Sequence, residues 1–333
     1  MIKVFYTSSE NKNYFGVNQV LNSLKKFLYK KTLIYNTGGI YKFLSNKYDL
    51  IHIHGCWKIR LFVYFLFSKL RNIKIVISPH GMLDPHSLKN KKLIKIVFWH
   101  FCQKMIFVLS DQIIVNSILE KKNVLKMIKH NNIKIIPHGI KLELLNHKNK
   151  RLKKNPLKFV FFSKIHPSKN LLGLINLWTN KNFLKNLDLS IYGEITDNRY
   201  FEKVSKKISK LKNIKYHGAL YKNKVKILSN YDVFIFPSKS ENFGLVVLEA
   251  LASGLYVIID KNLSWGNLKK LGFASLITFT GNSLTKEIKN IDKVKHQIRS
   301  KNYLKKKRYF LKKKHNWNII SSNYLNSYKN LTN

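Results

Sequence analysis

Two glutamates eight positions apart, Glu241 and Glu249, lie in the segment PSKSENFGLVVLEALASG, which joins a buried strand to a mostly apolar helix. A capping box with Ser238 would be enough to explain Glu241, because it precedes the expected helix start. No such role explains Glu249, which lies two turns into the helix among Leu, Val and Ala. A carboxylate there can accept two hydrogen bonds from vicinal hydroxyls, such as those of a ribose. The backbone N–H groups of 242–244, at the expected start of the helix, could bind sugar hydroxyls or a phosphate.

Two lysines follow an earlier strand, in the loop SKIHPSKN at 163–170. Lys164 lies at the strand end and Lys169 lies near the start of the next helix, where backbone N–H groups already favour an anion. Lysine is abundant throughout the chain, so only the placement of these two supports a phosphate site. The loop is therefore a candidate anion site.

Histidines follow several predicted strands, in HIHG at 52–55, SPHG at 78–81 and IPHGI at 136–140. A single histidine at a strand end is more often a hydrogen-bonded structural residue than a catalytic one. Several at successive strand ends favour a functional role for some, and His80 between Pro79 and Gly81 is the first candidate. No acidic or cysteine ligand lies at a useful spacing from these histidines, so no metal site is predicted.

The elements that would position these residues alternate between short apolar strands and longer helical patterns. This rhythm is typical of an α/β protein whose parallel sheets carry helices on both faces. The pattern lapses at 141–157 and then restarts, which predicts two doubly wound domains, 1–150 and 157–310, followed by a C-terminal helix at 311–333. The predicted strands are 4–6, 50–53, 73–78, 112–115 and 133–136, then 159–163, 187–192, 214–217, 233–236 and 256–260. The predicted helices include 19–29 and 93–109, then 171–178, 222–229 and 244–252.

The 333 residues contain 62 Lys and Arg against 16 Asp and Glu, a formal net charge of +46. Such an excess favours a polyanion partner, either nucleic acid or an anionic membrane face. An AT-rich coding background is the alternative explanation, because nearly all of the positive charge is lysine and asparagine is also abundant. The two cysteines fit a reducing cytoplasm. The N-terminus is typical of a first strand rather than a signal peptide, and no apolar stretch is long enough to predict a membrane span.

Taken together, these motifs resemble the retaining glycosyltransferases of family 4, which have the GT-B fold. The segment with Glu241 and Glu249 resembles that family's signature. Further matching segments occur in the family's order along nearly the whole chain: HIHG, SPHGMLDP, NSILE, IPHGI, SKIHPSKN, YHGAL and SWGNL. The resemblance implies two Rossmann-like domains facing a central cleft. It also implies an N-terminal acceptor-binding domain, a C-terminal domain that binds a nucleotide-sugar, and a C-terminal helix that packs back on the first domain.

The resemblance also assigns roles by position. Lys164 and Lys169 would hold the donor diphosphate, and Glu249 would bind the ribose. Glu241 and the amides of Asn242, Phe243 and Gly244 would bind the transferred sugar, His80 would contact that sugar near its anomeric carbon, and Gly16 would face the phosphates. The sequence departs from the family pattern at Lys164, where arginine is usual, and lysine cannot make arginine's bidentate fork to phosphate.

The implied activity is transfer of a hexose from a UDP- or GDP-linked donor to a saccharide or lipid-linked acceptor, with retention and without a metal. Members most similar to this chain build bacterial surface polysaccharide and lipopolysaccharide. A GT-B epimerase or phosphorylase is the nearer alternative, and a basic polyanion-binding protein is the remoter one. The absence of a nucleic-acid-binding signature and the scarcity of arginine argue against nucleic acid. Lysines at 25–26, 30–31 and 89–92 predict peripheral docking of a cytoplasmic protein on an anionic inner membrane.

Overall fold

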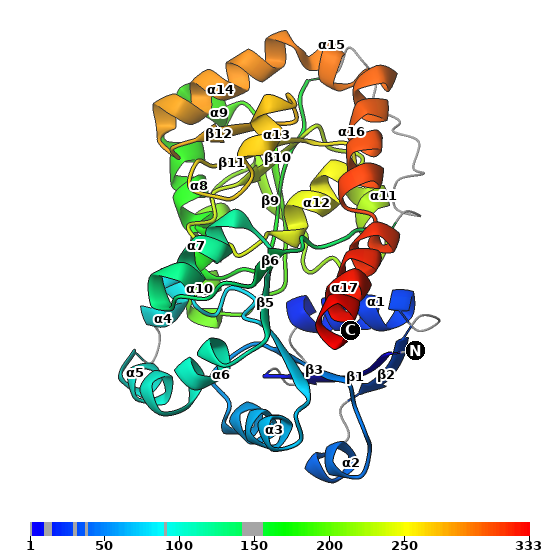
Figure 1. The fold of residues 1–333 in the computed structure, drawn as a ribbon. Helices are drawn as coiled ribbons and strands as arrows, with labels where there is room; N and C mark the ends of the chain where they lie inside the picture. The colour runs from blue at the N-terminus through cyan, green and yellow to red at the C-terminus, as the bar shows by residue number, and fades with distance from the viewer. Residues whose placement is uncertain (1, 10–14, 29–31, 37–38, 90–91, 142–155) are drawn as a thin grey trace. The chain divides into compact units, whose positions relative to one another are not determined.

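The computed structural model describes residues 2–9, 15–28, 32–36, 39–89, 92–141 and 156–333. The chain forms two compact units, each with its own sheet (Figure 1). Unit 1 comprises residues 1–139 and 315–333, and unit 2 comprises residues 140–314. These limits differ from the expected ends at 150 and 310. Ile140 already belongs to the core of unit 2, and the segment that joins unit 1 is 315–333 rather than 311–333.

Unit 1 contains a six-stranded sheet in the order β2-β1-β3-β4-β5-β6, and every neighbouring pair is parallel. The strands are β1 (Ile2–Ser8), β2 (Thr32–Asn36), β3 (Leu50–His54), β4 (Lys74–Ser78), β5 (Gln112–Val115) and β6 (Ile133–Ile135). Five of the six were predicted, with ends that differ by at most two residues. The segment that forms β2 was not predicted as a strand.

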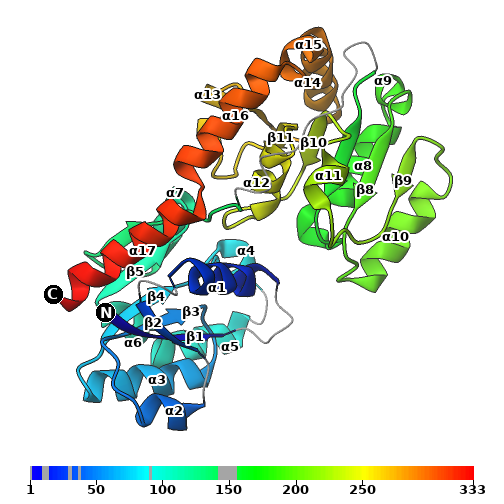
Figure 2. The ribbon, with the colours of Figure 1, turned by 90° about the vertical axis from the view of Figure 1, so that its right-hand side faces the viewer.

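The helices of unit 1 are α1 (Phe15–Leu28), α2 (Ile40–Leu44), α3 (Ile59–Leu70), α4 (Pro85–Lys89), α5 (Lys92–Phe98), α6 (Lys104–Val108), α7 (Ile118–Met127) and α17 (Trp317–Thr332). The single helix predicted at 93–109 was wrong in one respect, because a π-helical turn, η1 (Trp99–Gln103), separates α5 from α6. The C-terminal α17 lies beside α1 in both views (Figure 2). Buried side chains of α17, among them Trp317, Ile320 and Tyr324, extend the apolar core beneath α1.

Unit 2 contains a second parallel sheet, in the order β12-β11-β10-β7-β8-β9. Its strands are β7 (Phe159–Phe162), β8 (Leu189–Tyr192), β9 (Ile214–Tyr216), β10 (Val233–Phe236), β11 (Tyr256–Asp260) and β12 (Ala274–Ile277). The order runs outward from β7 in one direction and from β10 in the other. The point where β7 meets β10 is therefore the topological switch point, outside which ligands of doubly wound sheets bind.

The helices of unit 2 are α8 (Leu171–Thr179), α9 (Asn182–Lys185), α10 (Asn198–Ile208), α11 (Lys224–Leu228), α12 (Leu245–Ala252), α13 (Gly266–Lys270), α14 (Gly281–Lys293), α15 (Lys295–Ile298) and α16 (Lys301–Lys314), with a 3₁₀ turn, η3 (Pro167–Lys169). Two buried cations join α15 and α16 to the sheet. Arg299 pairs with Asp232 at 2.7 Å, with both side chains at most 3% exposed. Lys307 donates to the carbonyls of Gly254 and Leu255 just beyond α12.

No helix in the described part of the chain is both long and apolar enough to span a bilayer.

Candidate functional site

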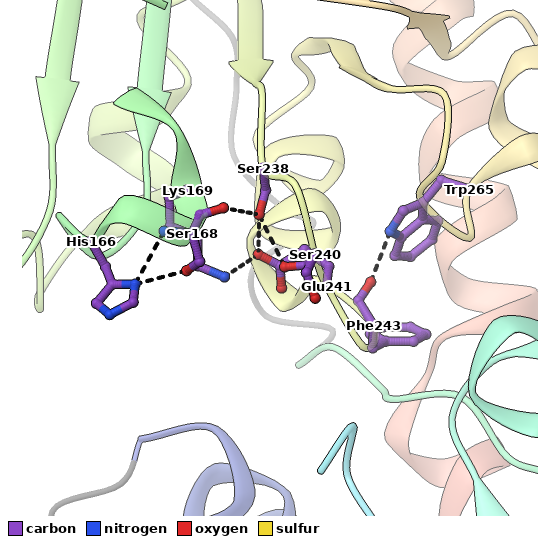
Figure 3. A network of polar contacts seen from close by, with 8 residues as sticks. All are labelled: His166, Ser168, Lys169, Ser238, Ser240, Glu241, Phe243 and Trp265. Carbon is purple, nitrogen blue, oxygen red and sulfur yellow. Dashed lines mark hydrogen bonds and ion pairs between the residues drawn. The ribbon is translucent and has the colours of Figure 1, made fainter. Parts of the chain in front are cut away.

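Two loops flank the switch point of unit 2, one after β7 and one after β10, and hydrogen bonds join them (Figure 3). The backbone N–H of Lys239 donates to the carbonyl of Ser168 at 3.1 Å, and the Ser238 hydroxyl donates to the same carbonyl at 3.3 Å. These bonds link segments about seventy residues apart in the chain. The two motifs that sequence reasoning treated separately therefore form one site.

The charged centre of this site is an ion pair between Lys169 Nζ and Glu241 Oε1. Both side chains are largely buried, with exposed fractions of 18% and 14%. Ser238 donates from Oγ to the same Glu241 oxygen at 3.1 Å. The capping box considered for Ser238 and Glu241 is not what the structure has, because α12 begins after Gly244 with no side-chain cap. Glu241 instead fixes the ammonium of Lys169 at the carboxyl end of β7.

The β7–α8 loop is shaped by short-range bonds that leave its lysines at the strand end. His166 Nδ1 accepts from the backbone N–H of Ser168 and caps η3, and Asn170 ends η3 in the left-handed region at φ 55°. Lys164, which directly follows Ser163, is half-buried. Gly193 permits this path, because a Cβ at that position would lie 1.8 Å from the carbonyl oxygen of Ser163.

The start of α12 is held by a bond from Trp265 Nε1 to the carbonyl of Phe243 at 2.8 Å (Figure 3). Gly244 lies at φ 77°, a conformation that other residues adopt only with strain. The turn at Asn242, Phe243 and Gly244 thus precedes the first helical residue, where backbone N–H groups have no intrahelical partner. It lies immediately after Glu241 in the chain and suits a ligand that carries hydroxyl or phosphate oxygens.

Glu249 lies inside α12, as predicted, with its side chain 13% exposed. Its Oε1 lies 3.3 Å from Nζ of Lys224, a residue at the start of α11. Burial raises the pKa of Glu249, and the nearby Lys224 ammonium opposes that rise. The same ammonium lies 5.3 Å from the ring centroid of Phe162 on β7. A carboxylate so placed can accept hydrogen bonds from a ligand if Lys224 keeps it ionised.

The histidines predicted at strand ends of unit 1 form a buried cluster. His54 Nδ1 and His80 Nε2 are 2.8 Å apart, and the ring of His80 also stacks near that of His138, with centroids 6.1 Å apart. His52 is fully buried and bonds Tyr328 and Ser78 at 2.7 and 2.9 Å. This assigns His52 a structural role. Burial lowers the pKa of His80 to about 4, so its imidazole is neutral at physiological pH.

Glu120 fixes the turn that contains His80. Its carboxylate accepts from the backbone N–H of Gly81 and from that of Asn116, both at 2.6 Å. His80 itself has φ 51°, and Asn116 Nδ2 lies 3.3 Å from its Nδ1. The turn after β4 is thereby tied to the turn after β5. Gly16, the remaining predicted site residue, lies in the first turn of α1.

Comparison with known families supports the two-domain fold. The family described as Glycosyltransferase Family 4 matches residues 8–144, and the family described as Glycosyl transferases group 1 matches residues 144–266. The chain has the GT-B fold of glycosyltransferases, and two glycosyltransferase family models match it in succession. Its sequence thus divides between two family domains in the same order as the two sheets.

Solved structures match the chain over almost its whole length. HepE from Anabaena, crystallised with UDP-glucose, is 17% identical and superposes with a TM-score of 0.74 over 99% of this chain and 100% of that one. Sucrose-phosphate synthase from Thermosynechococcus elongatus is 15% identical, with a TM-score of 0.76 over 99% and 98% of the two chains. At these identities the likeness shows the fold alone.

A protein described as an uncharacterized 41.2 kDa protein in the cps region of Klebsiella pneumoniae is 28% identical to this chain over 235 residues. That match covers 65% of this chain and about three-fifths, 61%, of the relative.

Three polar residues that complete the two candidate sites were not predicted from the sequence. Lys224 gave no signal, because it is one of many lysines in a basic helix. Asn116 and Glu120 stood in a recognised motif, but only the tertiary structure shows that they reach the turn with His80. No group of three or more His, Cys, Asp and Glu suited to a metal ion occurs among the residues that the structure describes.

Proposed function

We propose that this chain is a glycosyltransferase that moves a hexose from a UDP- or GDP-linked donor to a saccharide or lipid-linked acceptor, with retention of the anomeric configuration. The observation that carries the proposal is the Lys169–Glu241 pair at the switch point of unit 2. The cation and carboxylate of this pair lie next to the turn before α12, at the end of the sheet where doubly wound domains bind nucleotides. The UDP and UDP-glucose named with HepE support a nucleotide-sugar as the ligand.

The proposed roles follow the chemistry of each group. Lys164 and Lys169 bind the diphosphate and stabilise the negative charge that develops as it leaves. Glu249 accepts hydrogen bonds from the ribose hydroxyls. Glu241 and the amides of 242–244 bind hydroxyls of the transferred sugar. On resemblance alone, His80 and Gly16 of unit 1 are proposed as further donor contacts.

Retention is proposed to proceed by attack on the face from which the diphosphate departs. The bond between the anomeric carbon and the phosphate oxygen breaks, the bond to the acceptor oxygen forms, and the departing phosphate oxygen takes the acceptor's proton. The two lysines supply the charge that this departure requires, so we propose that no metal ion is needed. Transfer should then persist in EDTA.

The chain is proposed to act in surface polysaccharide or lipopolysaccharide biosynthesis, on the cytoplasmic side of the membrane. The relative in a cps region supports the first part. Lysines 25 and 26 on α1 and lysines 89 and 92 beside α5 are proposed to attract an anionic membrane face; lysines 30, 31 and 91 lie outside the described residues. Sedimentation with anionic and neutral liposomes tests this, and equal binding to both would contradict it.

Kinetics of single variants test the donor site. Lys169→Met should lower kcat by about a hundredfold, because removing a group that stabilises a developing charge costs about 2.7 kcal/mol or more. Glu249→Gln should mainly raise KM for the donor. Lys306→Met, on the exposed side of α16, is the control. If Lys169→Met and Glu249→Gln transfer sugar as fast as the parent, the site assignment is wrong.

A further inference from the structure

An open cavity of about 570 Å³ lies in unit 1, bordered by the turn after β4 and by α4, α5, η1 and α7. This volume is in the range of cavities that hold small-molecule ligands. Its walls are largely apolar and come from Trp57, Leu83, Leu88, Ile96, Trp99 and Met127. Apart from lysines, the polar lining residues are Asn123 and His100. The scarcity of hydrogen-bond acceptors among them makes the cavity a poor fit for a free saccharide and a better one for an apolar chain.

The cavity is strongly basic. Four lysines line it, Lys89, Lys92, Lys95 and Lys126, and no carboxylate does so among the described residues. The nearby Asp84 is engaged by the backbone N–H of His86 at 2.9 Å. A ligand with an apolar body and an anionic head would match this combination of apolar walls and ammonium groups.

Unusual backbone at two points shapes the cavity. Trp57 has φ 66°, a strained value for a tryptophan, and its backbone N–H donates to Gln103 Oε1 at 2.9 Å. Gln103 ends η1, the π-helical turn that also carries Trp99, and its Nε2 is buried with no hydrogen-bond partner among the described residues. Strained residues and π-turns recur at functional sites. Here both hold the two tryptophan rings, whose centroids are 6.3 Å apart, in the cavity wall.

The helix that forms one wall also exposes apolar side chains outside the cavity. Leu93, Ile94 and Val97 on α5 are 79%, 68% and 58% exposed, and Phe101 in η1 is 73% exposed. Monomeric proteins seldom expose so much contiguous apolar surface without a partner. An apolar surface beside a lysine-rich apolar cavity suits a ligand drawn from a lipid phase.

We propose that this cavity binds the apolar chain of a lipid-linked acceptor, whose phosphate or diphosphate contacts the surrounding lysines. The proposal rests on the transferase function above and deepens it, since it names the acceptor as a lipid phosphate rather than a free saccharide. The atoms that react are not in this cavity. It holds the chain and the phosphate, which would orient the saccharide that the lipid carries.

Binding of farnesyl diphosphate, followed by tryptophan emission, tests the cavity directly, because two of the chain's five tryptophans line it. Lys126→Glu and Ile96→Asp should each weaken binding by about tenfold or more, since each places a carboxylate against the anionic or apolar part of the ligand. The matched controls are Lys122→Glu and Ile118→Asp, both on α7, where Ile118 is 65% exposed. Neither control residue lines the cavity, and both should bind within about twofold of the parent. Thermal unfolding of each variant separates misfolding from lost contact.

Comparison ligands identify the occupant. Farnesol, which lacks the diphosphate, and inorganic diphosphate, which lacks the chain, should both bind much more weakly than farnesyl diphosphate. Equal binding of inorganic diphosphate would overturn the proposal in favour of a simple anion site. An equal loss of affinity for farnesyl diphosphate in the two control variants would show that the ligand does not bind in this cavity. Phosphatidylglycerol vesicles that give the same emission change with the same variant pattern would make the surface a membrane contact instead. No donor is present, so these outcomes are independent of the transfer kinetics that test the proposed function.

Discussion

Replacing Glu120 by glutamine should destabilise unit 1 more than any surface change of charge. The Glu120 side chain is buried, with the residue 3% exposed. It accepts from the N–H groups of Gly81 and Asn116 at 2.6 Å each. Glutamine keeps one acceptor and turns an NH₂ donor toward the other N–H. One charge-assisted bond, about 1.5–3 kcal/mol, is lost and the other is weakened, so the expected loss in unfolding free energy is about 3 kcal/mol.

Thermal unfolding and hydrogen exchange measure this loss. For a unit of about 160 residues, 1 kcal/mol shifts Tm by about 2–4 °C, so the Glu120→Gln transition of unit 1 should fall by about 6–12 °C. Amide exchange should accelerate first at Gly81 and Asn116, and with them the turn that positions His80. Glu202→Gln, an exposed change of the same chemistry on α10, is the control. A Tm shift below about 1 °C with unchanged exchange would refute the assignment of Glu120 as the tie between the two turns.

Three further outcomes follow from buried charges. Burial lowers the pKa of His80 from 6.5 to about 4, so as the pH falls this histidine is protonated in the unfolded chain before it is protonated in the folded one. Its contribution to the free energy of unfolding is complete above about pH 6.5 and should fall by about 2 kcal/mol from pH 7 to pH 5. Urea unfolding at both pH values checks this, and an unchanged pH dependence in His80→Gln would contradict it. Lys307→Met leaves two buried carbonyls without their donor and should cost about 2–4 kcal/mol in urea unfolding, whereas exposed Lys306→Met should cost nothing measurable. Lys224→Met removes the cation beside buried Glu249. The pKa of that carboxyl should rise further, so UDP binding should weaken most at low pH. Calorimetric titrations that show equal UDP affinity for parent and variant across pH 5–8 would count against the role of Lys224.

Much of the fold could be predicted because parallel strands buried on both faces appear as short, continuous apolar runs. The segments that form β5, β10 and β11 were predicted with the observed ends. β2 and β12 were missed. Each lies at an edge of its sheet, although the opposite edge strands β6 and β9 were predicted. In β12 the larger apolar residues, Leu276 and Ile277, are only half-buried. The π-turn at Trp99–Gln103 gives no sequence signal, because its residues continue the helical pattern on either side.

The candidate site could be predicted as far as residue types carry the chemistry. Glu249 stood out because a carboxylate is unusual on an apolar helix, and the structure places it there. The Ser238–Glu241 capping box was a fair alternative from spacing alone. Only the tertiary structure shows that Glu241 pairs with Lys169, about seventy residues earlier in the chain. Lys224 could not be found among so many lysines. The high net charge likewise did not predict the basic cavity of unit 1, because a count of charges does not show which residues lie together in the folded protein.

The proposed donor site is tested most directly by thermal unfolding in the presence of UDP-, GDP-, ADP- and CMP-sugars. A ligand that binds only the folded protein at a hundred times its Kd adds about 2.7 kcal/mol. For unit 2, with about 175 residues, this raises Tm by about 5–10 °C. The account predicts such a shift for a UDP- or GDP-sugar and its loss in Glu249→Gln. No shift with any nucleotide-sugar, or an undiminished shift in Glu249→Gln, would contradict it.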